Sequence, residues 1–118
     1  MGLMKLCSLL VLTATALLAD VTGKWTASFE TEIGTQNYTY DFKQTGDKLT
    51  GTAKSNLGSG VITEGSVKGD DITFVEILNF QDQEIRITYK GKISGDEIKF
   101  TRQVADVATE ELVAKRVK

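Results

Sequence analysis

The residues of this chain that could carry chemistry are two opposite charges set among apolar neighbours. Glu76 lies between Phe74 and Leu78 in the run ITFVEILNF, and Arg102 follows Phe100 in the run IKFTR. Apolar residues at alternate positions are typical of a strand with one buried face, and this spacing puts both charges on that face. A buried charge without a partner costs several kcal/mol, so we expect the two residues to be paired.

Three interpretations of Glu76 and Arg102 are open at this level. They form a structural ion pair in a filled interior, or they anchor a ligand in an interior pocket. In the third interpretation a bulge turns Glu76 outward, because Val75 and Ile77 make its strand apolar on both faces. If Glu76 faces inward, Val75 and Ile77 form an outer apolar patch, and a homodimer through this patch is predicted.

Other catalytic or metal-binding groups are scarce. The chain has no histidine, and its single cysteine is Cys7. Without an imidazole or a second thiol, the usual nucleophile–base arrangements and histidine-held zinc or haem cannot be assembled. The acidic pairs 70–71 and 96–97 lie in predicted turns, which explain them. We therefore predict a protein that is not an enzyme, with no cofactor, no metal site and no disulfide.

The first 19 residues are predicted to be a signal peptide, followed by one domain at 20–118. Lys5 precedes an apolar run from Leu6 to Leu18, with small residues for cleavage at Ala16 and Ala19. This run is shorter than the roughly 20 residues that a membrane helix needs. We expect a secreted or periplasmic protein.

The charge balance of the predicted domain is acidic. It holds 13 Lys and Arg, the chain's 14 less Lys5, against 16 Asp and Glu, for a net charge of about −3. Nucleic-acid binding requires a surplus of Lys and Arg, so we expect no nucleic-acid partner.

A Gly-Asp pair recurs three times in similar surroundings, in TGDKL at 45–49, KGDDI at 68–72 and SGDEI at 94–98. Each pair is typical of a two-residue β-hairpin turn, in which glycine supplies the positive φ of the first central residue. Polar residues flank each turn, and mostly apolar residues follow one step further out. The three hairpins therefore agree on one inner face.

Extending this alternation predicts an all-β fold of eight strands. They are expected at 21–33, 36–45, 48–56, 60–68, 71–80, 83–94, 97–104 and 110–117. One register places all nine aromatic residues inside, together with Val61 and Thr63 of the fourth strand. The outer row of 83–94 carries charges that could not face lipid, which argues against a transmembrane barrel.

Eight antiparallel strands in chain order close most simply into an up-and-down β-barrel without an edge strand. The Gly-Asp turns occupy every second connection and are expected to close one end. Longer loops are expected around the open end, where a ligand would enter. The predicted rim of the open end consists of Gln36, Asn37, Asn56, Asn79, Gln81 and Gln103.

The segments VTGKW at 21–25 and AKRVK at 114–118 resemble the calycins, which comprise lipocalins, fatty-acid-binding proteins and avidins. In this family a Gly-x-Trp on the first strand is covered by Arg or Lys of the last strand. Gly23, Trp25 and Arg116 match those positions at the closed end. The chain is also similar to small exported bacterial domains of unassigned role, some of them found beside carbohydrate-active enzymes.

The resemblance implies a barrel that binds a small molecule, with departures. The lipocalin disulfides and C-terminal helix are absent, and Trp25 is the only tryptophan, so biotin binding is not carried over from avidins. An inward arginine of the fatty-acid-binding relatives supports Arg102 as a ligand anchor.

The sequence therefore predicts an exported, non-catalytic protein that holds a small, mostly apolar ligand in its barrel. The ligand is expected to contact Tyr38, Tyr40, Glu76, Phe80 and Arg102. The alternative is a protein- or glycan-interaction module that acts through the open-end loops around a filled interior. Eight strands give an interior just wide enough for either arrangement, so its free volume distinguishes them.

Overall fold

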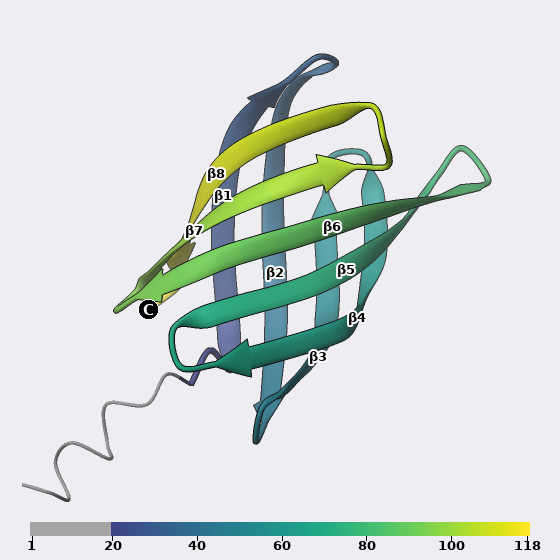
Figure 1. The fold of residues 1–118 in the computed structure, drawn as a ribbon. Coiled ribbons are helices and arrows are strands. Elements are labelled where there is room, and N and C mark those ends of the chain that lie inside the picture. The colour runs from purple at the N-terminus through teal and green to yellow at the C-terminus, as the bar shows by residue number, and fades with distance from the viewer. Residues whose placement is uncertain (1–19) are drawn as a thin grey trace, which may run out of the picture.

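The computed structural model describes residues 20–118, in which eight antiparallel strands close into a barrel (Figure 1). The strands follow one another in chain order, as predicted. Their bounds are β1 Gly23–Thr31, β2 Gly34–Thr45, β3 Lys48–Ser55, β4 Gly58–Lys68, β5 Asp71–Phe80, β6 Gln83–Ser94, β7 Glu97–Val104 and β8 Ala108–Arg116. The predicted signal peptide lies outside the described residues. No helix within residues 20–118 is long and apolar enough to cross a membrane.

The three Gly-Asp pairs form the β2–β3, β4–β5 and β6–β7 turns, as predicted. Their glycines have φ angles of 61–64°. The backbone carbonyl of each turn aspartate accepts a hydrogen bond of 2.8–2.9 Å from a later strand, with the pairs Asp47–Val67, Asp70–Ile93 and Asp96–Arg116. The repeated sequence therefore joins each hairpin to the next element at the closed end.

The connections at the opposite end are mostly as short as the Gly-Asp turns. The β1–β2, β3–β4 and β5–β6 turns contain two residues each, and Ala105–Val107 connect β7 to β8. Strands β2 and β4 begin directly after their turns, because Gly34 and Gly58 adopt φ angles of 109° and 147°. The prediction of longer open-end loops was wrong for three of the four connections, and only the β7–β8 connection is longer than the Gly-Asp turns.

The β5–β6 turn places two non-glycine residues at positive φ. Gln81 and Asp82 have φ angles of 52° and 64°, as in a type I′ turn, which favours Asn-Gly. Because side chains are strained in this region, we expect Gln81→Asn with Asp82→Gly to raise the free energy of unfolding by about 1 kcal/mol. Urea denaturation would measure the gain.

The matched control for this prediction is Gly46→Asn with Asp47→Gly. It installs the same dipeptide in the β2–β3 turn, where only the glycine has positive φ. The free energy of unfolding of this control should not exceed that of the native chain. An equal gain in both turns would show that turn geometry is not the cause.

The nine aromatic residues lie on the inner face, as predicted. Eight of them are buried, and Phe80 is partly buried against the core. Tyr40, Phe74, Tyr89 and Phe100 form a cluster with ring centroids 4.3–6.3 Å apart. Together with Phe42 and Trp25 below them, these rings fill the closed half of the barrel.

Strand β4 corrects part of the predicted register. Ile62 is buried, whereas Val61 is 56% exposed on the outer face. The pairing with β5 shifts between Thr63 and Ser66, where Glu64 has a φ angle of 53°. Because this bulge adds a residue, Val67 faces inward as predicted, but Val61 and Thr63 do not.

The floor of the barrel is built around Trp25, as the resemblance implied. Trp25 is fully buried, and the guanidinium carbon of Arg116 lies 4.5 Å from its ring centroid. The indole Nε1 donates to the carbonyl of Val21 at 2.9 Å. Arg116 also donates to the Asp96 carboxylate at 3.0 Å. A cation–π contact and these hydrogen bonds therefore hold the two ends of the domain together.

Candidate functional site

Glu76 of β5 and Arg102 of β7 both face the barrel interior, with exposed fractions of 0% and 4%. The Tyr38 hydroxyl of β2 lies between them. It donates to Glu76 Oε2 at 3.0 Å and accepts from Arg102 Nη2 at 3.0 Å. The two charges are therefore bridged by a tyrosine.

Further tyrosines extend this contact into an interior polar network, which we define as Tyr38, Tyr40, Glu76, Tyr89, Arg102 and Glu110. Tyr89 donates to Glu76 Oε1 at 2.8 Å, and the hydroxyls of Tyr40 and Tyr89 lie 2.9 Å apart. Arg102 Nη1 forms an ion pair with Glu110 Oε1 of β8 at 2.9 Å. The network thus crosses the barrel from β2 to β8.

Three aromatic rings surround the guanidinium of Arg102. Its guanidinium carbon lies 5.0–5.7 Å from the ring centroids of Phe29, Tyr38 and Tyr89. Aromatic faces attract a cation, and more strongly where water is excluded. The positive charge is therefore held by rings on several sides and by Glu110 on another.

Burial raises the pKa of the Glu76 carboxyl above its usual range, while hydrogen bonds from Tyr89 and Tyr38 and the charge of Arg102 act in the opposite direction. Burial also raises the pKa of Tyr38, Tyr40 and Tyr89. The three phenols therefore stay neutral at physiological pH and serve as hydrogen-bond donors.

The raised pKa of Glu76 makes stability depend on pH. A carboxyl with a higher pKa in the folded state contributes most below its unfolded pKa, and this contribution is lost as pH rises through the folded pKa. We therefore expect the native chain to lose stability relative to Glu76→Gln as pH rises from about 4 to about 8. Urea denaturation at several pH values would measure the difference.

The control for the pH series is Glu84→Gln, which removes one exposed carboxylate from the outer face of β6. It distinguishes the effect of the buried carboxyl on stability from the effect of a change in net charge. Parallel profiles for the native chain and Glu76→Gln would contradict the prediction.

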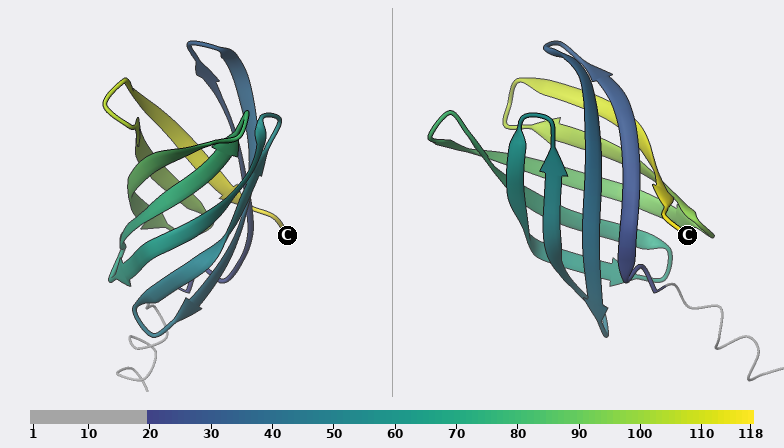
Figure 2. Two further views of the ribbon diagram at one scale, coloured as in Figure 1. Left: turned by 90° about the vertical axis from the view of Figure 1, so that its right-hand side faces the viewer. Right: turned by 180° about the vertical axis from the view of Figure 1, so that it is seen from behind.

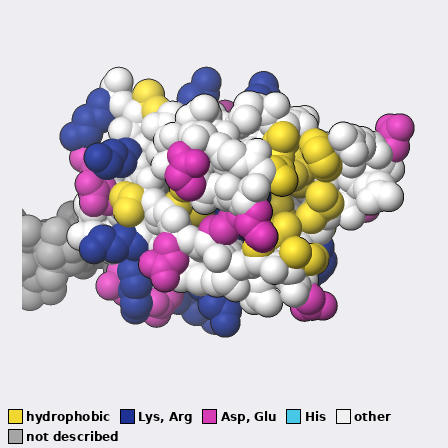
Figure 3. All heavy atoms as spheres, turned by 90° about the horizontal axis from the view of Figure 1, so that it is seen from above, with side chains coloured by type: hydrophobic (Ala, Val, Ile, Leu, Met, Phe, Trp, Pro, Cys, Tyr) yellow, Lys and Arg dark blue, Asp and Glu magenta, His cyan; other side chains and the backbone are white. Residues whose placement is uncertain are grey.

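A cavity of about 200 Å³ lies above the network at the open end of the barrel. Most of its wall is apolar, formed by Ile33, Leu57, Leu78, Phe80, Ile85, Ile87, Val104, Val107 and Ala108. Figure 3 shows hydrophobic side chains gathered toward one end of the molecule, in keeping with the 68% and 79% exposure of Ile33 and Val107. An apolar cavity of about 150 Å³ can hold benzene, so this one has room for a ligand of one ring.

Polar groups also line the cavity, among them Thr31 at the end of β1 and Glu32 in the β1–β2 turn. Gln36, Arg102 and Glu110 line it, on β2, β7 and β8. Gln36 Oε1 and Arg102 Nε are buried and have no hydrogen-bond partner within residues 20–118. Because buried polar atoms are nearly always paired, these two leave hydrogen-bonding capacity unused next to the cavity.

The predicted ligand-binding residues come together at two depths. Phe80 and Arg102 line the cavity, whereas Tyr38, Tyr40 and Glu76 lie beneath it in the interior polar network. The predicted rim residues are mostly outside the cavity. Of these six residues only Gln36 lines the cavity, and Asn37, Asn56, Asn79, Gln81 and Gln103 are exposed. The Asn56 side chain instead accepts from the Asn37 amide and donates to the Thr35 carbonyl, tying β2 to the β3–β4 turn.

Tyr89 and Glu110 were missed as partners of the charged pair. Both lie directly opposite Arg102 in the sheet, on β6 and β8. The sequence pattern does indicate that both side chains face inward. Glu110 alternates with Leu112 and Ala114 on the inner face of its strand, and Tyr89 lies on the predicted inner face of 83–94. Side chains directly opposite each other on one face lie within contact distance.

The outer patch predicted on β5 is only partly exposed. Val75 is 6% exposed and Ile77 is half-buried, while the exposed Val61 of β4 lies opposite Ile77. A homodimer through Val75 and Ile77 stays a prediction. Within residues 20–118 no group of three or more His, Cys, Asp or Glu could hold a metal ion.

No protein-family model, no curated protein and no solved structure matches this chain.

Proposed function

We propose that this protein is an exported, non-catalytic binding protein that holds a small, mostly apolar ligand at the open end of its barrel. The observation that carries the proposal is the cavity of about 200 Å³, with its apolar wall and the unpaired Gln36 Oε1 and Arg102 Nε beside it. The resemblance of Gly23, Trp25 and Arg116 to the calycin floor supports the same function.

The shape of the interior determines which ligands fit. Aromatic rings fill the closed half, so a long chain such as a fatty acid has no room to extend downward. Burying roughly 200 Å² of a ring-sized ligand gains about 5 kcal/mol before the cost of immobilisation. For a simple probe this corresponds to a roughly millimolar Kd, and the natural ligand would gain further from the polar groups.

The test uses benzyl alcohol, which combines one ring with a group that can donate and accept a hydrogen bond. At about ten times a millimolar Kd it should stabilise the folded state by about 1.4 kcal/mol. This corresponds to an increase in Tm of roughly 7 °C for a domain of this size. Val104→Phe enlarges a side chain of the cavity wall and fills the cavity, so it should abolish the increase in Tm.

The matched control is Val61→Phe, the same enlargement at an exposed position outside the cavity. It should keep the increase in Tm. The proposal fails if the native chain shows no increase, or if Val104→Phe and Val61→Phe respond alike.

A second candidate function is a protein- or glycan-interaction module acting through the open-end loops. It is favoured by the exposure of Ile33 and Val107 on the β1–β2 and β7–β8 connections. Replacing both residues with Ser should abolish partner binding under this candidate. Under the ligand proposal it should weaken benzyl alcohol binding only in part, because the rest of the wall is retained.

A further inference from the structure

The ladder between β1 and β8 is much shorter than the others. Only Trp25–Arg116 and Thr26–Lys115 pair in it, and Val117 donates to the Lys24 carbonyl at 2.8 Å. Every other adjacent pair of strands is matched over seven or more positions. Figure 2 shows β1 and β8 meeting near the C-terminus and diverging toward the open end. We call the divergent part the seam; it comprises 27–31 of β1 and 108–114 of β8.

The pairing pattern identifies which backbone groups face the seam. Continuing the register beyond Thr26–Lys115 would place Ser28 opposite Val113 and Glu30 opposite Glu111. Backbone groups alternate in direction along an antiparallel strand, and the Lys24 carbonyl points to β8. The N–H and C=O groups of Ser28 and Glu30 therefore face the seam, without a partner in β8.

Like charges would meet across the seam if it closed. Glu30 and Glu111 would lie directly opposite each other, and like charges in that position are destabilising. Glu30, Glu32 and Glu110 also line a hollow at the upper end of the seam. Acidic groups thus border the unpaired edges on both strands.

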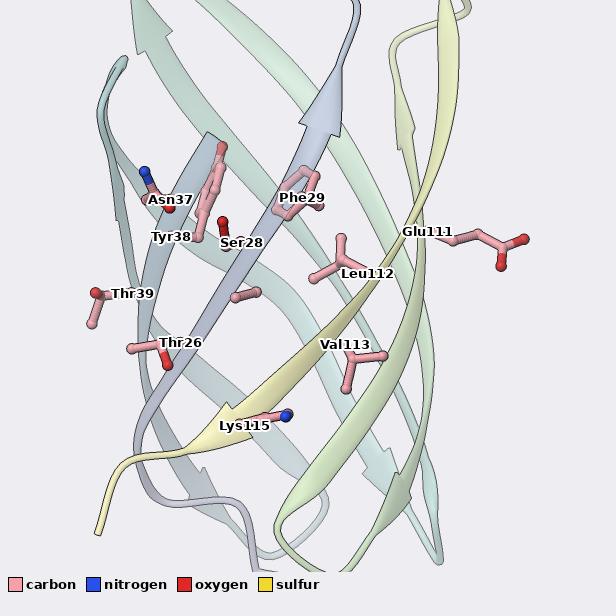
Figure 4. A pocket seen from close by; sticks show the side chains of 11 residues that line it. Thr26, Ser28, Phe29, Asn37, Tyr38, Thr39, Glu111, Leu112, Val113 and Lys115 are labelled. Carbon is pink, nitrogen blue, oxygen red and sulfur yellow. The ribbon is translucent and has the colours of Figure 1, made fainter. Parts of the chain in front are cut away.

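A second hollow, of about 700 Å³, lies along the seam and extends over β2, lined by residues of both edges and by 37–39. Figure 4 shows the Phe29 and Leu112 side chains between the two strands, with Glu111 directed away from them. Phe29 and Leu112 are buried and form an apolar floor, while Ser28 and Val113 lie on the exposed outer face. A strand inserted here would meet apolar groups inside and carboxylates outside.

We propose that the seam binds an extended segment of a partner protein, which adds a strand between β1 and β8. Its backbone pairs with Ser28 and Glu30, its inward side chains are small and apolar against Phe29 and Leu112, and its outward side chains are Lys or Arg between Glu30 and Glu111. Main-chain hydrogen bonds supply affinity in such strand addition, and alternate side chains supply specificity. The seam adjoins the cavity of the proposed function and shares Thr31, Ala108 and Glu110 with it. None of the residues assigned to contact the inserted segment lines that cavity, so this proposal does not rest on the proposed function.

The test measures binding of a short fluorescent peptide of alternating lysine and valine by anisotropy. The native chain should bind it, and should not bind the same peptide with glutamate in place of lysine. A peptide with proline in place of its central valine should bind at least tenfold more weakly, because it cannot complete the backbone ladder. Glu30→Gln with Glu111→Gln should weaken binding about tenfold.

The matched protein variants are Ser28→Pro and Ser28→Ala. Proline removes an N–H that faces the seam, and edge positions tolerate it, so Ser28→Pro should fold and lose the peptide. Ser28→Ala keeps the N–H and should bind as the native chain does. The proposal is overturned if the native chain does not bind, if the proline-containing peptide binds equally well, or if the charge variant binds unchanged.

Discussion

Replacing Arg102 with Met is expected to lower the free energy of unfolding by about 3–5 kcal/mol. The change removes the ion-pair partner of Glu110, whose side chain is only 12% exposed, and the donor to the Tyr38 hydroxyl. Glu76, fully buried, also loses its nearby positive charge. The loss is a large part of the total free energy of unfolding, which is about 5–15 kcal/mol for a typical domain. Urea denaturation followed by circular dichroism would measure it.

The matched control is Arg86→Met. Arg86 pairs with Glu64 at 2.6 Å, but both side chains are 56% exposed, so its loss should cost less than about 1 kcal/mol. Arg102→Met combined with Glu110→Gln should recover part of the loss, because no unpaired charge then remains at Glu110. Equal losses for Arg102→Met and Arg86→Met would contradict the role given to burial.

Replacing Trp25 with Ala is expected to lower the free energy of unfolding by about 3–5 kcal/mol. The indole is fully buried, and its removal leaves a cavity at the floor of the barrel. It also takes away the ring beneath Arg116 and the hydrogen bond to Val21. Because Trp25 is the only tryptophan, circular dichroism rather than indole fluorescence must follow unfolding.

Trp25→Phe separates the contribution of the aromatic ring from that of the indole hydrogen bond. It keeps an aromatic face for Arg116 but not the indole N–H, so it should retain more than half of the stability that Trp25→Ala loses. A loss below about 1 kcal/mol for Trp25→Ala would show that the floor does not depend on this ring.

Much of the fold could be predicted because its signals are local. The Gly-Asp turns fix the register of β2 with β3, β4 with β5 and β6 with β7, and the two-residue period then assigns the inner face. The bulge in β4 could not be predicted in this way. It adds one residue between Thr63 and Ser66, and periodicity alone does not say where an addition falls.

The inward position of the charged pair was predicted, but its contacts were not. Glu76 and Arg102 were found by parity, but the Tyr38 bridge depends on where β2 lies across the barrel. The seam was missed because no turn joins β1 to β8, so nothing local fixes their register. The opposition of Glu30 and Glu111 becomes visible only once Trp25 and Arg116 are paired.

The central claim, a ligand site at the open end of the barrel, is tested most directly by nuclear magnetic resonance with labelled methyl groups and benzyl alcohol. The methyl signals of Leu78, Ile85, Ile87 and Val104, which line the cavity, should shift and saturate together. Those of Leu49, Ile72 and Ile98, buried outside the cavity lining, should stay in place. The absence of saturable shifts, or shifts confined to Val61 and Ile77 on the outer face, would contradict the account.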